Sequence, residues 1–421
     1  ALLGVAQFWL DMGVDGFRLD ALNFGFHNRS LDDNPPRANP DPTRPHDFQA
    51  LVHNMSQPEL VPFAARLRAL TDQYHGRFTV AEIGGIDPTA EMQRLTAGDR
   101  LLNTAYNFDF LDGPQVDARH VAKVMARWPE GTWPSLAFSN HDAVRIVTRC
   151  AQGRDPDGYA RLMLLLLLCL RGNPFVYYGE ELGLPHTDVP FERLLDPEAI
   201  RNWPETKCRD GARTPMPWHG DAPGAGFGSD DPWLPLDPRH YALAVATQEA
   251  DAGSVLHFAR QAIGLRRDTP ALRLGGYELL RADVNLLAFV RSHGDDKLLC
   301  VFNLGLAKAE FAVPEAGEPL IALGDAKPQQ GVWPVPVKTA FDQGAICPLA
   351  QPSKHLMRSA DIGNVLCVRH SRVWGRHGTS WLRSWHCRPG SPSCVPSMSR
   401  TLHALRLLRK QDICSATSLL E

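Results

Sequence analysis

The feature that most constrains this 421-residue chain is a repeated alternation of short apolar runs with helical stretches. The predicted strands occupy residues 13–20, 78–83, 102–108, 136–139 and 174–178. Helical periodicity appears at residues 2–12, 57–74, 159–171 and 254–267. Strands that alternate with helices are typical of βα units, which build a parallel sheet covered by the helices. We therefore predict an α/β domain over residues 1–270.

The pattern changes past residue 270. Residues 282–291 and 297–304 are β-rich runs on either side of a polar turn, which predicts a small antiparallel β-domain over residues 271–325. From residue 326 the periodicity fades, while Cys, Arg, Ser, Trp and His become frequent together. We expect residues 326–421 to be an unstructured or spurious, out-of-frame tail. A nucleic-acid-binding patch is disfavoured because the tail has neither a motif nor a periodicity.

Composition excludes several classes of protein. Apolar residues make up 44% and charged residues 22%, so a large core can form and global disorder is excluded. The net charge of −3 disfavours nucleic acid or a membrane surface as a partner. The longest apolar run, residues 162–170, is shorter than the about 20 residues that a spanning helix needs. Four of the nine cysteines lie in the tail, and the other five are scattered without disulfide or metal spacing. This scatter fits a cytoplasmic location or simply inert core thiols, and we expect no metal or cofactor.

Charged residues lie at the ends of three predicted strands. Arg18 and Asp20 share one side of a strand because side chains alternate in direction. A guanidinium beside a carboxylate lowers its pKa and orients it. Glu82 ends an apolar strand, where partial burial would raise its pKa toward that of a general acid. Asn140, His141 and Asp142 follow another strand. Structural ion pairs or helix capping remain alternatives for each group.

The three acidic strand ends follow one another at intervals of 62 and 60 residues. Together with the string GFRLD at residues 16–20, this order resembles the α-amylase superfamily (glycoside hydrolase family 13), in its α-glucosidase and oligo-1,6-glucosidase branch. Residues 209–218 (RDGARTPMPW) are similar to a segment of exo-acting α-glucosidases, and residues 172–181 resemble the final barrel strand of the family. The resemblance covers roughly residues 1–325.

The resemblance implies a role for each matched residue. Asp20 would be the catalytic nucleophile, Glu82 the general acid/base and Asp142 a third carboxylate that binds ring hydroxyls. The implied substrate-binding residues are Arg18, Asn140, His141, Arg209 and Arg213. Of these, Arg213 would pair with an upstream carboxylate to seal the pocket.

The implied fold is α/β, a partial (β/α)8 barrel of about strands 4–8 followed by a truncated antiparallel β-domain. Because the family has three strands before the nucleophile, we expect an N-terminally truncated chain that is inactive as a fragment. Any structural or activating cation would then belong to the preceding part.

The implied function is that of a retaining exo-acting α-glucosidase, which hydrolyses or transfers terminal α-linked glucose from maltose-like oligosaccharides. Ala21, directly after the nucleophile, favours α-1,4 linkages. The alternatives are a non-catalytic sugar-binding or scaffold relative, or a sucrose- or trehalose-type phosphorylase or isomerase of the same superfamily. The presence of all three carboxylates favours an enzyme over a non-catalytic relative. The oligomeric state is left open.

Overall fold

The computed structural model describes residues 1–42, 44–106, 108–128, 131–205, 208–228, 231–306, 309–311, 318–323, 344–348, 361–362 and 368–369. The chain divides into two units, Ala1–Ser371 and Arg372–Glu421. All described residues belong to the first unit, so the fold below is the fold of that unit.

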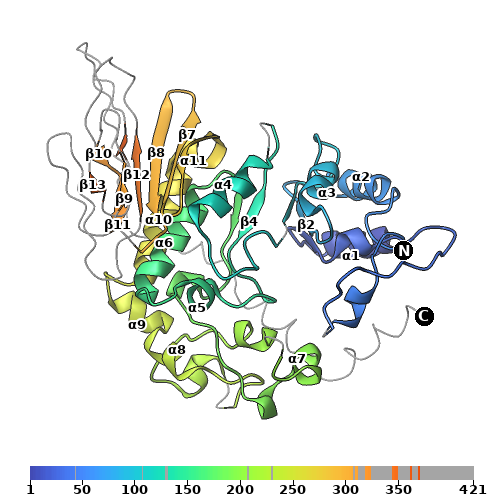
Figure 1. The fold of residues 1–421 in the computed structure, drawn as a ribbon, viewed down its shortest axis with the longest axis horizontal. Helices are drawn as coiled ribbons and strands as arrows, with labels where there is room; N and C mark the ends of the chain where they lie inside the picture. The colour runs from blue at the N-terminus through green and yellow to red at the C-terminus, as the bar shows by residue number, and fades with distance from the viewer. Residues whose placement is uncertain are drawn as a thin grey trace, which may run out of the picture. The chain divides into compact units, whose positions relative to one another are not determined.

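A five-stranded parallel sheet is formed by the five strands that the sequence predicts (Figure 1). Its strands are β1 (Gly16–Leu19), β2 (Phe78–Glu82), β3 (Thr104–Tyr106), β4 (Ser135–Ala137) and β5 (Asn173–Phe175). They lie side by side in chain order, each parallel to the next. The predicted α/β class is confirmed, and all five carboxyl ends meet at one edge of the sheet.

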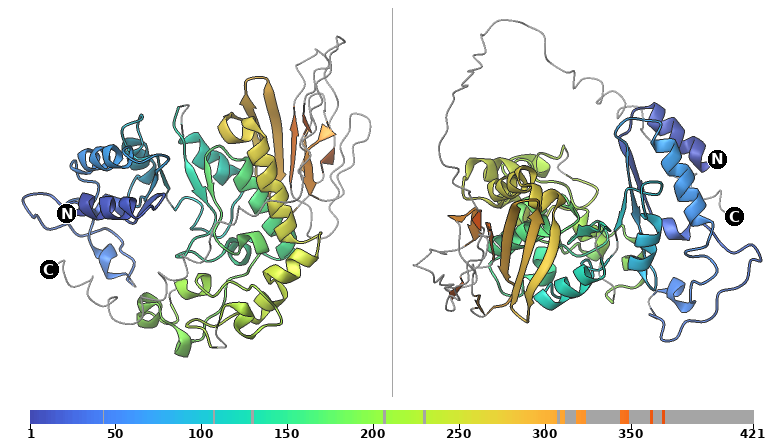
Figure 2. Two further views of the ribbon diagram at one scale, coloured as in Figure 1. Left: turned by 180° about the vertical axis from the view of Figure 1, so that it is seen from behind. Right: turned by 90° about the horizontal axis from the view of Figure 1, so that it is seen from above.

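Helices connect these strands and cover the sheet. They are α1 (Leu2–Asp11), α2 (Leu60–Thr71), α3 (Pro88–Leu95), α4 (Ala118–Ala126), α5 (Ile146–Cys150) and α6 (Pro156–Cys169). Figure 2, in its right-hand view, shows α1 and α2 together on one side of the first strands. Several helices start where an aspartate accepts a hydrogen bond from the first turn, as Asp155 does from Gly158 N before α6.

A second group of helices follows β5. They are α7 (Pro197–Arg201), α8 (Pro238–Ala242), α9 (Val245–Ala250), α10 (Val255–Asp268) and α11 (Pro270–Leu274). The predicted helices at residues 159–171 and 254–267 are confirmed as α6 and α10, which pack against each other. In the described part of the chain, every helix is too short or too polar to cross a lipid bilayer.

An antiparallel sheet follows α11. Its strands are β6 (Gly276–Ala282), β7 (Leu286–His293), β8 (Asp296–Asn303), β11 (Ile321–Leu323) and β12 (Gly344–Pro348), in the order β11-β12-β8-β7-β6. The predicted strand pair is confirmed as β7 and β8. Two short pairs join β9 (Ala309–Glu310) to β13 (Asp361–Ile362) and β10 (Glu318–Pro319) to β14 (Val368–Arg369).

The antiparallel sheet extends past residue 325, where the sequence analysis placed its end. The reason is that β12, at residues 344–348, pairs with β8 on one side and β11 on the other. Most of residues 326–421 lie outside the described residues, and the division of the chain into three domains otherwise stays a prediction.

One hydrophobic core joins the two sheets. The buried leucines of α6 belong to the same cluster as the apolar residues of β7 and β8. Arg291 of β7 is buried within this region, and burial lowers the pKa of its guanidinium to about 10. Its donors bond four main-chain carbonyls, those of Cys169 (2.6 Å), Leu272 (3.1 Å), Gly275 (2.9 Å) and Gly276 (2.9 Å). One side chain thus links α6 to the start of the antiparallel sheet.

We expect Arg291→Met to lower the free energy of unfolding by at least about 3 kcal/mol, because four carbonyl groups lose their donor in a buried site. Urea denaturation followed by circular dichroism measures the change. Arg281→Met is the matched control, since Arg281 pairs with Asp283 at the surface; it should change stability by less than about 0.5 kcal/mol. Equal losses in the two variants would contradict the linking role of Arg291.

Glu180 is a second buried charge, placed after β5 at the start of the 3-10 turn η3 (Glu180–Leu182). Its Oε2 accepts a hydrogen bond from Tyr177 N at 2.7 Å. Burial raises the pKa of its carboxyl from the ordinary 4.5 to about 7, although the hydrogen bond from Tyr177 and the charge of Arg145 oppose the shift. Glu180 therefore changes its charge near neutral pH.

This raised pKa predicts a pH-dependent stability. The folded state holds the Glu180 proton more tightly than the unfolded state does, so its favourable contribution is complete below pH 4.5 and is lost as the pH rises through about 7. Unfolding free energies of the wild type and Glu180→Gln, measured in urea between pH 5 and 8, should diverge by on the order of 3 kcal/mol. Glu249→Gln is the control, because the Arg260 partner lowers the pKa of that exposed carboxyl. Parallel curves for wild type and Glu180→Gln would show that Glu180 does not titrate here.

Candidate active site

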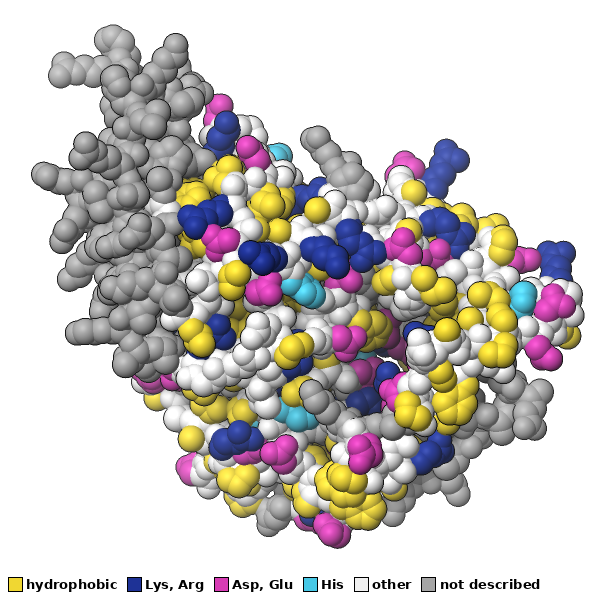
Figure 3. Space-filling model, viewed as in Figure 1, with side chains coloured by type: hydrophobic (Ala, Val, Ile, Leu, Met, Phe, Trp, Pro, Cys, Tyr) yellow, Lys and Arg dark blue, Asp and Glu magenta, His cyan; other side chains and the backbone are white. Residues whose placement is uncertain are grey.

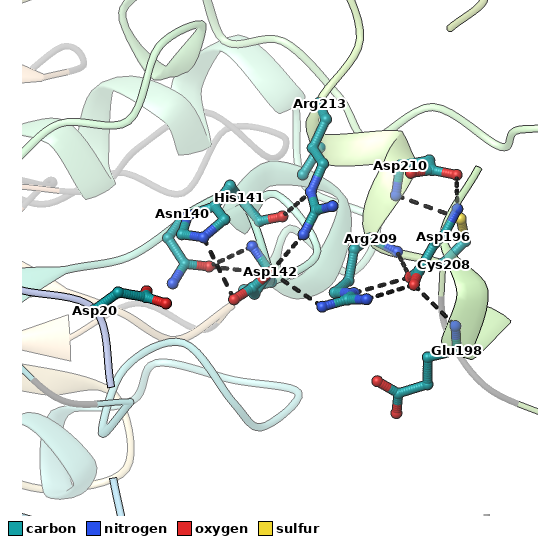
Figure 4. Close-up of polar contacts among 12 residues, drawn as sticks. Asp20, Asn140, His141, Asp142, Asp196, Glu198, Cys208, Arg209, Asp210 and Arg213 are labelled. Atoms are coloured by element: carbon teal, nitrogen blue, oxygen red, sulfur yellow. Dashed lines mark hydrogen bonds and ion pairs between the residues drawn. The ribbon is translucent and has the colours of Figure 1, made fainter. Parts of the chain in front are cut away.

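Polar side chains lie at the ends of four neighbouring strands, at the same edge of the parallel sheet. Asp20 follows β1, Glu82 ends β2, Tyr106 ends β3, and residues 140–142 follow β4. In Figure 4 the Asp20 carboxylate points toward Asn140 and its neighbours. Directly after Asp20, Ala21 adopts the left-handed conformation with φ of 42°, which turns the chain sharply. Such sparsely populated conformations gather at functional sites.

Arg18 joins the first two carboxylates. Its Nη1 donates to Asp20 Oδ1 at 2.6 Å, and its Nη2 donates to Glu82 Oε2. The Asp20 side chain is 73% exposed, whereas that of Glu82 is 12% exposed. One guanidinium therefore holds an open carboxylate and an enclosed carboxylate together. The structure confirms that Arg18 and Asp20 share one side of their strand.

The surroundings of Glu82 differ from the apolar strand end that the sequence suggests. Its Oε2 accepts hydrogen bonds from Arg18 and from the Tyr106 hydroxyl, the latter at 3.0 Å. A bound guanidinium favours the charged form of a carboxylate, so strand burial alone does not set the protonation state of Glu82. No local sequence pattern indicates this effect, because Arg18 and Glu82 lie 64 residues apart.

Tyr106 is a site residue that the sequence analysis did not identify. Its hydroxyl accepts hydrogen bonds from Arg18 Nη2 at 2.9 Å and Nε at 3.3 Å while donating to Glu82. Burial raises the pKa of Tyr106 and outweighs the opposing effect of Arg18, so the phenol keeps its proton at neutral pH. The available signal was its position near the end of the predicted strand 102–108, which follows the one that carries Glu82.

The β4 end forms a second cluster, centred on Asp142. Arg213 Nη2 donates to Asp142 Oδ1 at 2.6 Å, and Arg209 Nη1 lies 3.7 Å from the same atom. His141 Nε2 lies 3.5 Å from Asp142 Oδ2. Asn140 Oδ1 accepts hydrogen bonds from the main-chain N–H groups of Asp142 and Ala143, in the turn before α5. Helix capping, the alternative left open by the sequence, is not what these bonds do, because α5 begins after Arg145 and has no side-chain cap.

Two consequences follow for the residues around Asp142. Burial lowers the pKa of His141, with Arg18 and Arg213 acting in the same direction and Asp142 opposing them, so the imidazole is neutral at pH 7. Arg213 was expected to pair with a carboxylate upstream of the matched residues. In this structure its carboxylate partner is Asp142, and its Nε also donates to His141 O at 2.8 Å.

Arg209 is positioned by a further carboxylate. Its Nε and Nη2 donate to the two oxygens of buried Asp196 at 2.9 and 2.5 Å. Although burial opposes the shift, these hydrogen bonds and the charge of Arg209 lower the pKa of Asp196 to about 2. The sequence analysis named Arg209 but missed Asp196, which lies in a long segment without helical or strand periodicity.

A cavity of about 800 Å³ adjoins the Asp142 cluster. Asp142 and Arg209 line it, together with residues of the segments 41–44, 108–114 and 198–205. Arg44 Nε donates to Glu198 Oε1 at 2.8 Å across two of these segments. Asp20 and Glu82 are not among its lining residues. Figure 3 shows a hollow on one face of the molecule, where acidic and basic side chains gather.

All eight site residues named from the sequence thus lie at or next to the carboxyl edge of the parallel sheet. Arg18, Asp20 and Glu82 form one bonded group. Asn140, His141, Asp142, Arg209 and Arg213 form the other. The two groups interact electrostatically, since Arg18 and Asp20 both affect the pKa of His141. Among the described residues, no group of three or more His, Cys, Asp or Glu side chains is arranged to hold a metal ion.

Known proteins are similar to this chain in sequence. The catalytic domain of alpha amylase matches residues 1–275. A probable alpha-glucosidase of Rhizobium meliloti is 41% identical over 327 residues, which are 75% of this chain and 59% of that protein. An oligo-1,6-glucosidase of Halalkalibacterium halodurans is 30% identical over 346 residues, covering 73% of this chain and 59% of that protein. The chain therefore spans less than two thirds of the length of these relatives.

Solved structures agree with the sequence relatives. The crystal structure of an alpha-glucosyl transfer enzyme, XgtA, superimposes with a TM-score of 0.72 at 40% identity, covering 82% of this chain and 66% of that one. A structure of the trehalulose synthase MutB superimposes with a TM-score of 0.70 at 25% identity, covering 82% and 67% of the two chains. With its parallel sheet, its paired carboxylates and a match over residues 1–275, the chain belongs to the α-amylase family of glycoside hydrolases.

Proposed function

We propose that this site cleaves α-glucosidic bonds with retention of configuration, releasing terminal glucose from maltose-like oligosaccharides. The observation that carries the proposal is the sharing of Arg18 between exposed Asp20 and enclosed Glu82. A retaining glycosidase needs two nearby carboxyl groups, one charged and one able to deliver a proton. The names of the relatives, alpha-glucosidase and oligo-1,6-glucosidase, support the substrate class.

In the first step Asp20 attacks the anomeric carbon and forms a glycosyl ester, while the bond to the leaving oxygen breaks and Glu82 gives that oxygen its proton. Asp20 loses its charge in this step and Glu82 acquires one. Because Arg18 contacts both carboxyl groups, a single guanidinium neutralises whichever of the two is charged. In the second step Glu82 takes a proton from water, and that water cleaves the ester.

Asp142 is the third carboxylate of the proposed site. Arg213 and Arg209 orient its side chain, and a carboxylate accepts hydrogen bonds from ring hydroxyls. Neutral His141 beside it can donate or accept a hydrogen bond at the same sugar. Asn140 holds the turn that presents both residues.

Glucosyl transfer is the partner reaction of the same intermediate. An acceptor hydroxyl in the place of water would receive the glucosyl group from Asp20, with Glu82 again removing the proton. The similarity to an alpha-glucosyl transfer enzyme favours this second outcome. Preference for α-1,4 linkages, a cytoplasmic location and the absence of nucleic acid and membrane partners stay predictions from the sequence.

The nucleophile is tested by Asp20→Asn. Residues 1–421 are assayed with maltose, alone and co-expressed with the part of the Rhizobium meliloti relative that the match leaves out. We expect release of glucose as the α-anomer, read by proton NMR, and a rate at least ~10³-fold lower in Asp20→Asn because the ester cannot form.

Asp15→Asn is the matched control, since Asp15 lies at the surface just before β1 and pairs only with Arg77 among the described residues. Its rate should equal that of the wild type. Unchanged turnover in Asp20→Asn, or no turnover in either wild-type preparation, would refute the assignment. Phosphate-dependent release of a sugar phosphate would favour the phosphorylase alternative instead.

A further inference from the structure

We propose that Arg145, Tyr177 and Tyr178 are positioning residues that hold Arg213 against Asp142. None of the three belongs to the site described above. They come from the start of α5 and from the loop after β5, whereas Arg213 follows the 3-10 turn η5 (Arg209–Ala212). The inference rests on the proposed function, in which Asp142 binds the sugar.

The main chain on both sides of Arg213 is bonded by these side chains. Ala212 O accepts hydrogen bonds from Arg145 Nη2 (3.1 Å) and Tyr177 Oη (2.9 Å), and Tyr178 Oη lies 3.0 Å from it. The Tyr178 hydroxyl also lies 2.6 Å from Thr214 O. The carbonyl groups immediately before and after Arg213 are therefore both bound to another part of the fold.

Arg145 holds the two tyrosines in turn. It is 1% exposed, and its Nη1 donates to Tyr178 O at 2.6 Å. Its guanidinium lies 5.1 Å from the ring centre of Tyr177 and 4.7 Å from that of Tyr178, within the range of cation–π attraction. A planar guanidinium can make these bonds and stack at the same time, which a lysine ammonium cannot.

The loop after β5 runs close to Arg145. A Cβ atom at Gly179, where φ is 86°, would lie 2.8 Å from Arg145 Nη1 and 2.7 Å from Leu184 Cδ1. The approach leaves no room for a side chain. The loop and the guanidinium are therefore in close contact where Arg145 bonds Ala212 O.

Arg145 also follows Asp142 by only three residues, so the same short segment carries the carboxylate and the anchor for its partner. With its main chain held at Ala212 and Thr214, Arg213 reaches Asp142 Oδ1 at 2.6 Å and His141 O at 2.8 Å. The two tyrosine hydroxyls thus act on the site through Arg213, without touching the carboxylate themselves.

The pKa of His141 serves as the measure of where Arg213 lies. Arg213 lowers the pKa of His141 and Asp142 raises it, so displacement of Arg213 should raise that pKa by roughly 0.5–1 units. Histidine side-chain NMR across pH 5–8 provides the measurement, and His141→Gln identifies the signal. The variants are Arg213→Gln, Arg145→Lys and the double variant Tyr177→Phe/Tyr178→Phe, which keeps both rings.

We expect the pKa of His141 to rise in all three variants. Combining Tyr177→Phe/Tyr178→Phe with Arg213→Gln should raise it no further than Arg213→Gln alone, because both changes act through the contact of Arg213 with Asp142. Tyr74→Phe is the control, since it removes a hydroxyl that bonds Asp11 elsewhere; it should leave His141 unchanged. A His141 pKa that stays at the wild-type value in Arg213→Gln or in the tyrosine variant overturns the inference. The proposed function is tested separately, by the maltose turnover of Asp20→Asn.

Discussion

The guanidinium of Arg18 is the interaction on which the rest of the site depends. It bonds the carboxylates of two adjacent strands, one exposed and one enclosed, at the edge where the parallel strands end. A cation in contact with both carboxyl groups favours a negative charge on either of them. With it, the pair can exchange one negative charge between its members while the total charge of the group stays the same.

Two further sets of contacts hold the carboxylates of the site in position. Tyr106, from the next strand, completes the hydrogen bonds of Glu82. The long segment after β5 wraps back to the sheet edge and brings Arg209 and Arg213 to Asp142. The segment lacks long helices, so its position depends on buried polar contacts, such as that of Asp196 with Arg209. Separately, α6 shares a hydrophobic core with the antiparallel sheet.

Much of this could be predicted from local patterns. Strand positions followed from short apolar runs, which placed charged residues at the strand ends. The resemblance to the α-amylase superfamily then singled out Asp20, Glu82 and Asp142 among them. The strand at residues 344–348 was missed because it lies in a stretch without periodicity and is defined by pairing with β8. Tyr106, Asp196 and Arg145 were missed for a related reason, since each acts on residues distant in sequence.

The amino-acid sequence by itself determined the α/β class, the order of strands and helices, and the identity of the acidic residues at the strand ends, because these follow from periodicities of two and 3.6 residues and from local spacing. Only the tertiary structure decided which charges meet. The bond of Arg18 to Glu82 and the bond of Arg213 to Asp142 join residues that lie 64 and 71 positions apart. Such contacts depend on how strands and loops pack in space, which no local pattern encodes.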